Sequence, residues 1–408
     1  MTVQRVAIVS DYSLTTPGGA ETAYFEQVRT LGEQLEVTAY SSACPRFSEL
    51  DRFPGVSIEE VPILFRVPFL GLPVSRHDKR MHGFFVESFA RRRIEVVHIH
   101  SEFAMGAAAL SAARELGLPV VHTIHTFFWQ TAWPIQRLLG WGTPIYHHLV
   151  TGLDATRERL AERPGDSALR NMTLTVARQV DAIVSPSAHQ AHRLREAGLT
   201  NIAVIPNTMA APIDAEPVTE VGHPLRVLWI GRFMSQKRVL PFLRSVRQAM
   251  DALPRGYLAV DLIGEGDQFA QAAKLVRGYP EISLHGHVPH SQVQRMVADS
   301  HVTALTSVGW DNQPMVVVES ISALRGVIYC DPALTEGLVG PGIEAFGGED
   351  SGEAALARVL VELAHDPSRV IAASQAAIAA REEFSIETYT RRTLALYDEV
   401  VSSRRTDG

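Results

Sequence analysis

Short apolar runs, most of them rich in β-branched residues, recur along the chain, and longer segments with helical spacing separate them. Apolar residues at that spacing predict amphipathic helices, as in Tyr24, Val28, Leu31 and Leu35, and again in Val239, Leu243, Val246 and Met250. We predict strands at residues 5–9, 95–100, 120–124, 181–185, 202–205, 226–230, 258–263, 282–285, 302–306 and 327–330. Such alternation of strands and helices indicates an α/β protein with parallel sheets covered on both faces.

The predicted strands form two groups, and a stretch rich in proline separates them. Residues 206–224 contain Pro206, Pro212, Pro217, Gly222 and Pro224, a composition typical of a linker. A chain of 408 residues also exceeds the roughly 250–300 residues that one hydrophobic core usually serves. We therefore predict an N-terminal Rossmann-like domain at 1–207, completed by an amphipathic C-terminal helix at 384–408, and a C-terminal Rossmann-like domain at 224–383.

Composition and charge exclude several classes of protein. Apolar residues make up 46% and charged residues 20%, as in ordinary folded proteins, and the net charge of −7 argues against nucleic-acid binding. Cys44 and Cys330 are too few for a disulfide framework or a cysteine zinc site. The N-terminus lacks the pattern of a secretory signal, and no run of about 18 apolar residues occurs. We expect a cytoplasmic protein, or one peripheral on the inner face of the cell membrane.

Two turns after predicted strands suit phosphate groups. Gly18 and Gly19 immediately precede the first predicted helix, where backbone amides favour an anion, although a flexible turn would have the same sequence. In the second half, Arg232 and Lys237 follow a strand and precede a helix. Two such cations would stabilise a diphosphate leaving group, and the alternative is a solvated basic turn. Neither a GxGxxG dinucleotide fingerprint nor a P-loop motif is present.

Two further segments of the second half contain candidate ligand-binding residues. Gly264 and Glu265 follow a strand, in a loop suited to close contact with a nucleotide or in an ordinary turn. Asp311 precedes a helix that begins near Pro314, and Glu319 lies within that helix among apolar neighbours. A buried carboxylate needs a partner, so we predict that one carboxylate faces a sugar and the other a ribose diol.

Histidines mark the ends of two strands in the first half. His125 follows the strand at 120–124, where it is either structural or faces a ligand. His98 and His100 alternate on another strand, but no third ligand lies nearby at metal-ligand spacing. We therefore predict no metal site, and no cofactor other than a substrate nucleotide.

Taken together, these motifs resemble the family-four retaining glycosyltransferases, and the similarity covers nearly the whole chain. The resemblance implies the GT-B architecture, in which two Rossmann-like domains face each other across a cleft. It implies that Gly19 contacts the leaving phosphate, that Arg232 and Lys237 hold the diphosphate, and that His125 lies near the transferred sugar. The resemblance also implies a nucleotide-sugar site that includes Gly18, Gly264, Glu265, Val288 at the base, Asn312, Gln313, Pro314, Met315 and Glu319 at the ribose. Asp311 stands where the family usually has glutamate, and its side chain, which the resemblance implies contacts the sugar, is one methylene shorter.

Residues 100–130 look most like bacterial diacylglycerol glucosyltransferases, and residues 310–320 are similar to actinobacterial lipid mannosyltransferases. The resemblance therefore implies transfer of a hexose from UDP-glucose or GDP-mannose to a membrane glycerolipid or glycolipid, with retention of configuration. A glycosyltransferase with a soluble small-molecule or oligosaccharide acceptor is an alternative. A nucleotide-sugar epimerase and a non-catalytic subunit that binds nucleotide sugar are alternatives from other classes.

A basic segment with interleaved phenylalanines, at residues 63–93, is a candidate membrane-binding surface. It contains seven Arg or Lys residues against Asp78 and Glu87. Basic side chains attract anionic lipid headgroups, and aromatic side chains insert at the interface. The phenylalanines of this segment are Phe65, Phe69, Phe84, Phe85 and Phe89. The alternative is that these phenylalanines belong to the core and the cations to an ordinary solvated face.

Overall fold

The chain folds into two compact units, each built around one parallel sheet. The computed structural model describes residues 3–12, 14, 18–50, 52–66, 73–128, 133–209, 213–346 and 352–406. Unit 1 comprises Met1–Ala210 with Ile386–Gly408, and unit 2 comprises Ala211–Ser385. The two sheets confirm the predicted class of two Rossmann-like α/β domains.

Unit 1 contains a seven-stranded sheet in the order β3-β2-β1-β6-β7-β8-β9, and all of its ladders are parallel. Its strands are β1 (Arg5–Val9), β2 (Glu36–Ser41), β3 (Val56–Glu60), β6 (Val96–Ile99), β7 (Val120–Thr123), β8 (Ala182–Ser185) and β9 (Ile202–Val204). A separate antiparallel pair joins β4 (Phe65–Arg66) to β5 (Pro73–Val74).

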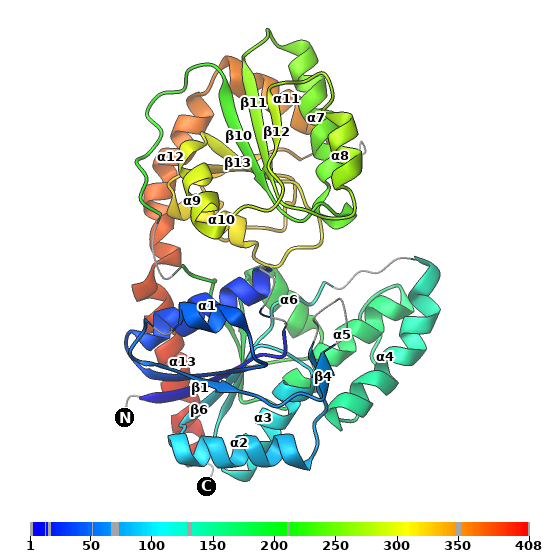
Figure 1. The fold of residues 1–408 in the computed structure, drawn as a ribbon, viewed down its shortest axis with the longest axis vertical. Helices are drawn as coiled ribbons and strands as arrows, with labels where there is room; N and C mark the ends of the chain where they lie inside the picture. The colour runs from blue at the N-terminus through cyan, green and yellow to red at the C-terminus, as the bar shows by residue number, and fades with distance from the viewer. Residues whose placement is uncertain are drawn as a thin grey trace. The chain divides into compact units, whose positions relative to one another are not determined.

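Helices cover both faces of this sheet. Neighbouring residues of a strand point to opposite faces, and those of β1 are buried on both. Val6 and Ile8 of β1 pack in a cluster with α1 (Gly19–Gly32) and the final helix α13 (Ile386–Thr406). Ala7 and Val9 pack in another cluster with α2 (Lys79–Arg92) and α3 (Ala104–Glu115). Figure 1 shows α1 and α13 beside β1, and α2 and α3 below the sheet. The remaining helices of the unit are α4 (Gln136–Thr151), α5 (Pro164–Ala177) and α6 (Ala188–Glu196).

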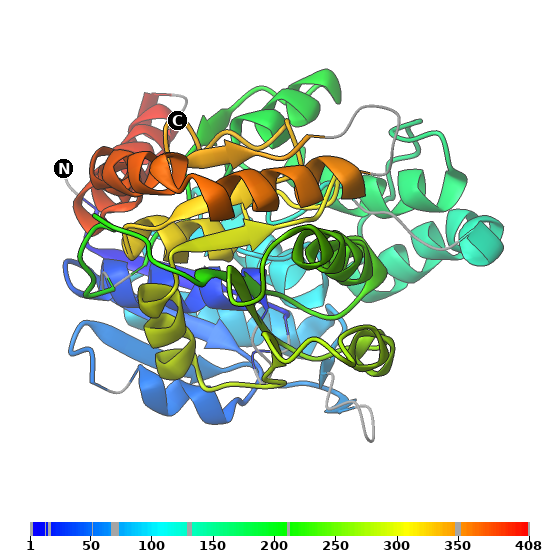
Figure 2. The same ribbon diagram turned by 90° about the horizontal axis from the view of Figure 1, so that it is seen from above.

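Unit 2 contains a six-stranded parallel sheet in the order β12-β11-β10-β13-β14-β15. Its strands are β10 (Leu225–Ile230), β11 (Leu258–Ile263), β12 (Ile282–Leu284), β13 (Val302–Leu305), β14 (Gly326–Tyr329) and β15 (Gly342–Glu344). Helices α7 (Val239–Ala252) and α11 (Glu353–His365) lie side by side against the sheet core (Figure 2). The other helices of the unit are α8 (Phe269–Leu275), α9 (His290–Asp299), α10 (Met315–Ser322) and α12 (Ser368–Ala380).

All the strands predicted from the sequence are present, with ends that differ by at most one residue. The prediction missed β2, β3, β4, β5 and β15. β2 has a mixed sequence, EVTAYS, and β15 has only three residues, GIE, so neither forms an apolar β-branched run. β4 and β5 have only two residues each. β3 lies at the edge of the sheet, and its half-buried sequence VSIEE contains only two apolar residues.

The prediction that the phenylalanines of residues 63–93 face a membrane is wrong for Phe85 and Phe89. Both are fully buried on α2, and their rings lie 5.6 and 5.5 Å from the ring of Tyr40. Arg91 forms an ion pair with Glu59. Phe69 lies outside the described residues. Among the described helices, none combines the length and the apolar character needed to cross a membrane.

Candidate functional site

The carboxyl ends of parallel strands share one edge of a sheet, and ligands of open α/β sheets bind there. In unit 2, the segments that follow β10, β11, β12 and β13 all begin at this edge. These segments and the helix that follows β13 contain Arg232, Lys237, Gly264, Glu265, Val288, Asp311, Asn312, Gln313, Pro314, Met315 and Glu319. The fold thus places the predicted donor residues of the second half at one end of one sheet.

The side chain of Lys237 is fixed by an ion pair. Its Nζ contacts Oδ1 of Asp311, and Ser307 donates its hydroxyl to Oδ2 of the same carboxylate. The main-chain carbonyl of Lys237 accepts a 2.7 Å hydrogen bond from Thr306 Oγ1, which in turn accepts from Trp229 Nε1 at 3.0 Å. The amine is therefore held at the strand edge, where it remains one-fifth exposed. The sequence placed both charged residues at the site but did not indicate that they pair.

Close backbone packing explains the glycine that follows β11. Gly264 has a φ of +131°, and a Cβ atom at this position would lie 2.0 Å from the carbonyl oxygen of Gly231. Its amide donates to the carbonyl of Gly286 at 2.9 Å, and the amide of Phe233 donates to the carbonyl of Glu265 at 2.8 Å. These bonds connect the loops after β10, β11 and β12, so a larger residue at 264 would force them apart.

Glu319 is buried in α10, and Arg232 is exposed. Oε1 of Glu319 lies 4.0 Å from Nδ1 of His290, the first residue of α9. Pro314 caps α10, and the residues around it, Asn312, Gln313 and Met315, are buried. The site therefore presents an exposed guanidinium, a paired ammonium and a buried carboxylate, which suit the diphosphate and the hydroxyl groups of a nucleotide sugar.

In unit 1, the two predicted glycines begin α1. Gly18 is its N-cap, and a Cβ atom there would lie 2.2 Å from Oε2 of Glu21. A Cβ atom on Gly19 would meet no described atom within 4 Å. The described packing therefore does not itself require glycine at position 19, which agrees with a backbone kept open for a ligand.

His125 follows β7, is half-buried and lies beside the buried histidines His98, His100 and His122. Its Nε2 lies 2.8 Å from Nδ1 of His100. Burial lowers the pKa of His125 to about 4 and that of His98 to about 3, so both are neutral at pH 7. His98 Nε2 bonds the hydroxyl of Thr123 at 2.7 Å. No group of three or more potential metal ligands occurs among the residues that the structure describes.

Two carboxyl groups of unit 1, the half-buried Asp11 and the buried Glu102, were not predicted. Asp11, just after β1, accepts hydrogen bonds from the amides of Met105 and Gly106 in the first turn of α3, at 2.7 and 2.9 Å. Glu102, just after β6, accepts from Thr173 Oγ1 at 3.1 Å. Burial raises the pKa of both, that of Glu102 to about 7. The sequence feature that could have identified Asp11 and Glu102 is their position shortly after a strand.

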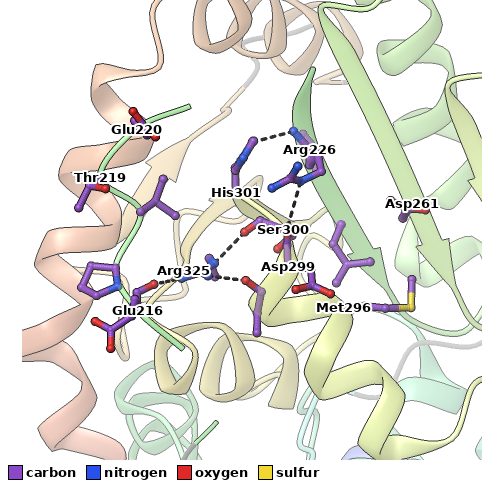
Figure 3. A pocket seen from close by; sticks show the side chains of 15 residues that line it. Glu216, Thr219, Glu220, Arg226, Asp261, Met296, Asp299, Ser300, His301 and Arg325 are labelled. Carbon is purple, nitrogen blue, oxygen red and sulfur yellow. Dashed lines mark hydrogen bonds between the residues drawn. The ribbon is translucent and has the colours of Figure 1, made fainter. Parts of the chain in front are cut away.

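A cavity of about 630 Å³ lies elsewhere in unit 2 (Figure 3). Arg226 in β10 and His301 before β13 place it at the amino ends of these strands, opposite the predicted donor residues. Arg325, labelled in Figure 3, donates to the carbonyls of Ser300 and Glu216, both at 2.7 Å. Since this guanidinium is used to hold main-chain segments together, the cavity does not resemble the predicted phosphate site.

Two family models match the chain. Residues 17–209 match the model described as Glycosyltransferase Family 4, and residues 224–366 match the model described as Glycosyl transferases group 1. The matched regions fall in units 1 and 2, respectively.

Curated relatives match over shorter stretches. An alpha-monoglucosyldiacylglycerol synthase of Acholeplasma laidlawii is 27% identical over 146 residues, which is 33% of each chain. The enzyme of the same name from Streptococcus pneumoniae is 27% identical over 124 residues, 30% of this chain and 26% of its own. The match thus spans a third or less of the length of these relatives.

Solved structures are similar over almost the whole chain. HepE from Anabaena, in complex with UDP, has a TM-score of 0.67 at 15% identity and covers 98% of this chain and 100% of its own. A sucrose-phosphate synthase from Thermosynechococcus elongatus has a TM-score of 0.66 at 16% identity, with the same coverage. These likenesses confirm the predicted GT-B fold.

Proposed function

Because the chain belongs to the family-four glycosyltransferases, we propose that it transfers a hexose from a nucleoside diphosphate sugar to a membrane glycerolipid or glycolipid, with retention of configuration. The observation that supports this most directly is the cluster of Arg232, Lys237, Asp311 and Glu319 at one edge of the unit 2 sheet. HepE, which has the same fold, was solved with UDP and with UDP-glucose.

The proposed chemistry depends on charge. Negative charge grows on the diphosphate as the bond to the sugar breaks, and the guanidinium of Arg232 and the ammonium of Lys237 stabilise that charge. Asp311 keeps Lys237 in place before the donor binds, since its other oxygen is held by Ser307. The acceptor hydroxyl attacks from the face that the diphosphate leaves, and a departing phosphate oxygen takes its proton. This route gives retention without a covalent enzyme intermediate.

Full activity is expected after exhaustive treatment with a chelator. In the proposed site, two side-chain cations supply the positive charge that a divalent metal ion supplies in other enzymes. Turnover should be measured on chelator-treated protein, with and without added Mg²⁺ or Mn²⁺. Loss of activity in the chelator and its return with either ion would contradict the proposed metal-independent site.

Glu319→Gln is expected to weaken nucleotide binding about tenfold or more, because a carboxylate that accepts hydrogen bonds from a diol is replaced by a neutral amide. Calorimetry should compare a ribonucleoside diphosphate with its 2′-deoxy analogue, and Glu362→Gln, an exposed change on α11, is the matched control. The wild type should prefer the ribonucleotide, and Glu319→Gln should abolish that preference. An unchanged preference would make Glu319 a structural residue.

Support for the lipid acceptor comes from the curated relatives, whose name identifies them as synthases of a glucosyldiacylglycerol, and from the resemblance of residues 100–130 and 310–320 to lipid glycosyltransferases. Thermal shift across nucleotide sugars would identify the donor first, because a ligand at 100 times its dissociation constant stabilises the fold by about 2.7 kcal/mol. UDP-glucose and GDP-mannose are the donors to compare.

A further inference from the structure

The outer face of α4 in unit 1 is apolar. Leu138 and Trp141 are 65% and 72% exposed, and Ile145 and Leu149 follow at the same helical spacing, both exposed. Tyr146 beside them is also exposed. Helical spacing places the first four side chains on one stripe of the helix. A large aromatic and three aliphatic residues therefore face away from the protein along the length of α4.

The inner face of the same helix is polar. The side chain of Gln136 is buried, donates to Asp166 on α5 at 2.9 Å and accepts from the amide of Gly165 at 2.8 Å. His147, also buried, bonds the carbonyl of Glu102 at 2.7 Å. Thr143 and Thr151 complete this face, and both are buried.

Helix α4 thus has its polar and apolar faces the opposite way round from an ordinary helix at a protein surface in water. Such a helix buries its apolar stripe and exposes its polar residues. In α4 the polar residues are satisfied inside the unit, and the apolar stripe is left outside. An exposed contiguous apolar stripe indicates a surface that binds another apolar phase. Tryptophan and tyrosine on such a stripe are typical of the boundary between lipid chains and water.

The charge around α4 favours an anionic surface. The sequence contains no Asp or Glu between Glu115 and Asp154. At the carboxyl end of the helix, the amide of His77 donates to the carbonyl of Val150 at 2.8 Å, which fixes the segment that leads into α2. That segment and the first turn of α2 expose three cations, Arg76, Lys79 and Arg80, against one carboxylate, Asp78.

We propose that α4 lies in the interface of a lipid bilayer that contains anionic lipid, with Trp141 and Leu149 inserted among the lipids and the cations of 76–80 on the headgroups. The inference deepens the proposed function and rests on it, because a bilayer is where a lipid acceptor is found. The inserted apolar side chains are thus those of α4 rather than those of α2, where Phe85 and Phe89 belong to the core, and only the cations before and in the first turn of α2 contact the headgroups.

The test is sedimentation of the purified full chain with vesicles of phosphatidylcholine alone or mixed with phosphatidylglycerol. The wild type should bind the mixed vesicles, more weakly as salt rises. The double variant Trp141→Ser with Leu149→Ser should bind at least about tenfold more weakly, because each removes an inserted apolar side chain. The matched control, Val339→Ser with Ile378→Ser, changes two exposed apolar residues of unit 2 and should bind like the wild type.

A second variant separates charge from insertion. Serine at Arg76, Lys79 and Arg80 should reduce binding to anionic vesicles and remove its salt dependence. Serine at Arg255, Lys274 and Arg277, which are exposed in unit 2 and have the same total charge, should not. Circular dichroism should show the same helix content in all the variants.

Three outcomes would overturn the inference. They are a wild type that does not bind anionic vesicles at low salt, an α4 variant that binds as well as the wild type, and a dimer in ultracentrifugation that only the α4 changes dissociate while vesicle binding is unaffected. Glycosyl transfer to a dispersed short-chain diacylglycerol is measured separately. Binding through α4 without transfer to any lipid would support the docking surface and contradict the proposed acceptor. Transfer to lipid without vesicle binding would support the proposed acceptor and contradict the docking surface.

Discussion

Lys237→Ala is expected to lower turnover by about 10²–10³, with little change in the melting temperature. The ammonium is fixed by Asp311 at the strand edge, so its contribution requires no rearrangement when charge develops on the diphosphate. Loss of one preorganised donor to a developing charge typically has an effect of this size. Arg232→Ala should cause a comparable loss, because the exposed guanidinium acts on the same charge.

Single-turnover measurements at saturating donor test this expectation, because they separate the chemical step from donor binding. Lys274→Ala, which removes an exposed lysine on α8 of the same unit, is the matched control and should leave turnover unchanged. Wild-type turnover in both Lys237→Ala and Arg232→Ala would show that neither cation stabilises the leaving group. A lower melting temperature that accounts for the loss would make the two residues structural.

Acid is expected to destabilise unit 1 well before its surface carboxylates are protonated. Burial lowers the pKa of His98 and His122 to about 3 and that of His125 to about 4, while an unfolded chain binds these protons near pH 6.5. As the pH falls below 6.5, the unfolded state therefore takes up protons that the folded state does not bind, and the free energy of unfolding decreases until about pH 3. Glu102 opposes this trend, since its pKa is raised to about 7 and its folded form gains a proton first.

With His100, whose pKa burial also lowers well below 6.5, four histidines against one carboxyl group leave a difference of about three protons, so the free energy of unfolding should fall by about 4 kcal/mol between pH 6 and pH 5. Urea titrations across this range measure the slope directly. His122→Val should reduce the slope by about one proton, because it removes one titrating group and, since neither ring nitrogen of His122 has a hydrogen-bond partner in the structure, breaks no hydrogen bond. A stability that is flat from pH 6.5 to pH 5, or a slope that His122→Val does not change, would contradict the neutral histidine cluster.

Ten of the strands were predictable, because short apolar runs mark buried parallel strands, and the proposed donor-site residues follow such strands in the sequence. Contacts between distant segments were not. Lys237 and Asp311 are 74 positions apart, and no periodicity connects them. Asp11 fixes the first turn of α3 through a similar long-range contact.

The sequence also did not indicate which side of a helix packs against the rest of the unit. Leu138, Trp141, Ile145 and Leu149 have the spacing of a core stripe, but polar contacts of Gln136 and His147 hold the opposite side of α4 against the unit. In α2 the opposite holds. The basic residues predicted an exposed membrane-binding face, but Phe85 on this helix is buried in the core. Periodicity identifies a stripe, whereas tertiary packing decides what it contacts.

Transfer of a hexose to lipid in a defined mixture tests the central claim most directly. The purified chain is incubated with UDP-glucose or GDP-mannose and anionic vesicles containing diacylglycerol or a glycolipid, and the products are followed by release of nucleoside diphosphate and by NMR of the anomeric carbon. The account predicts that one of the two donors releases nucleoside diphosphate only when the lipid acceptor is present, and that the product is an α-glycoside like the donor. Release that does not depend on the lipid, or a β-glycoside product, would contradict it.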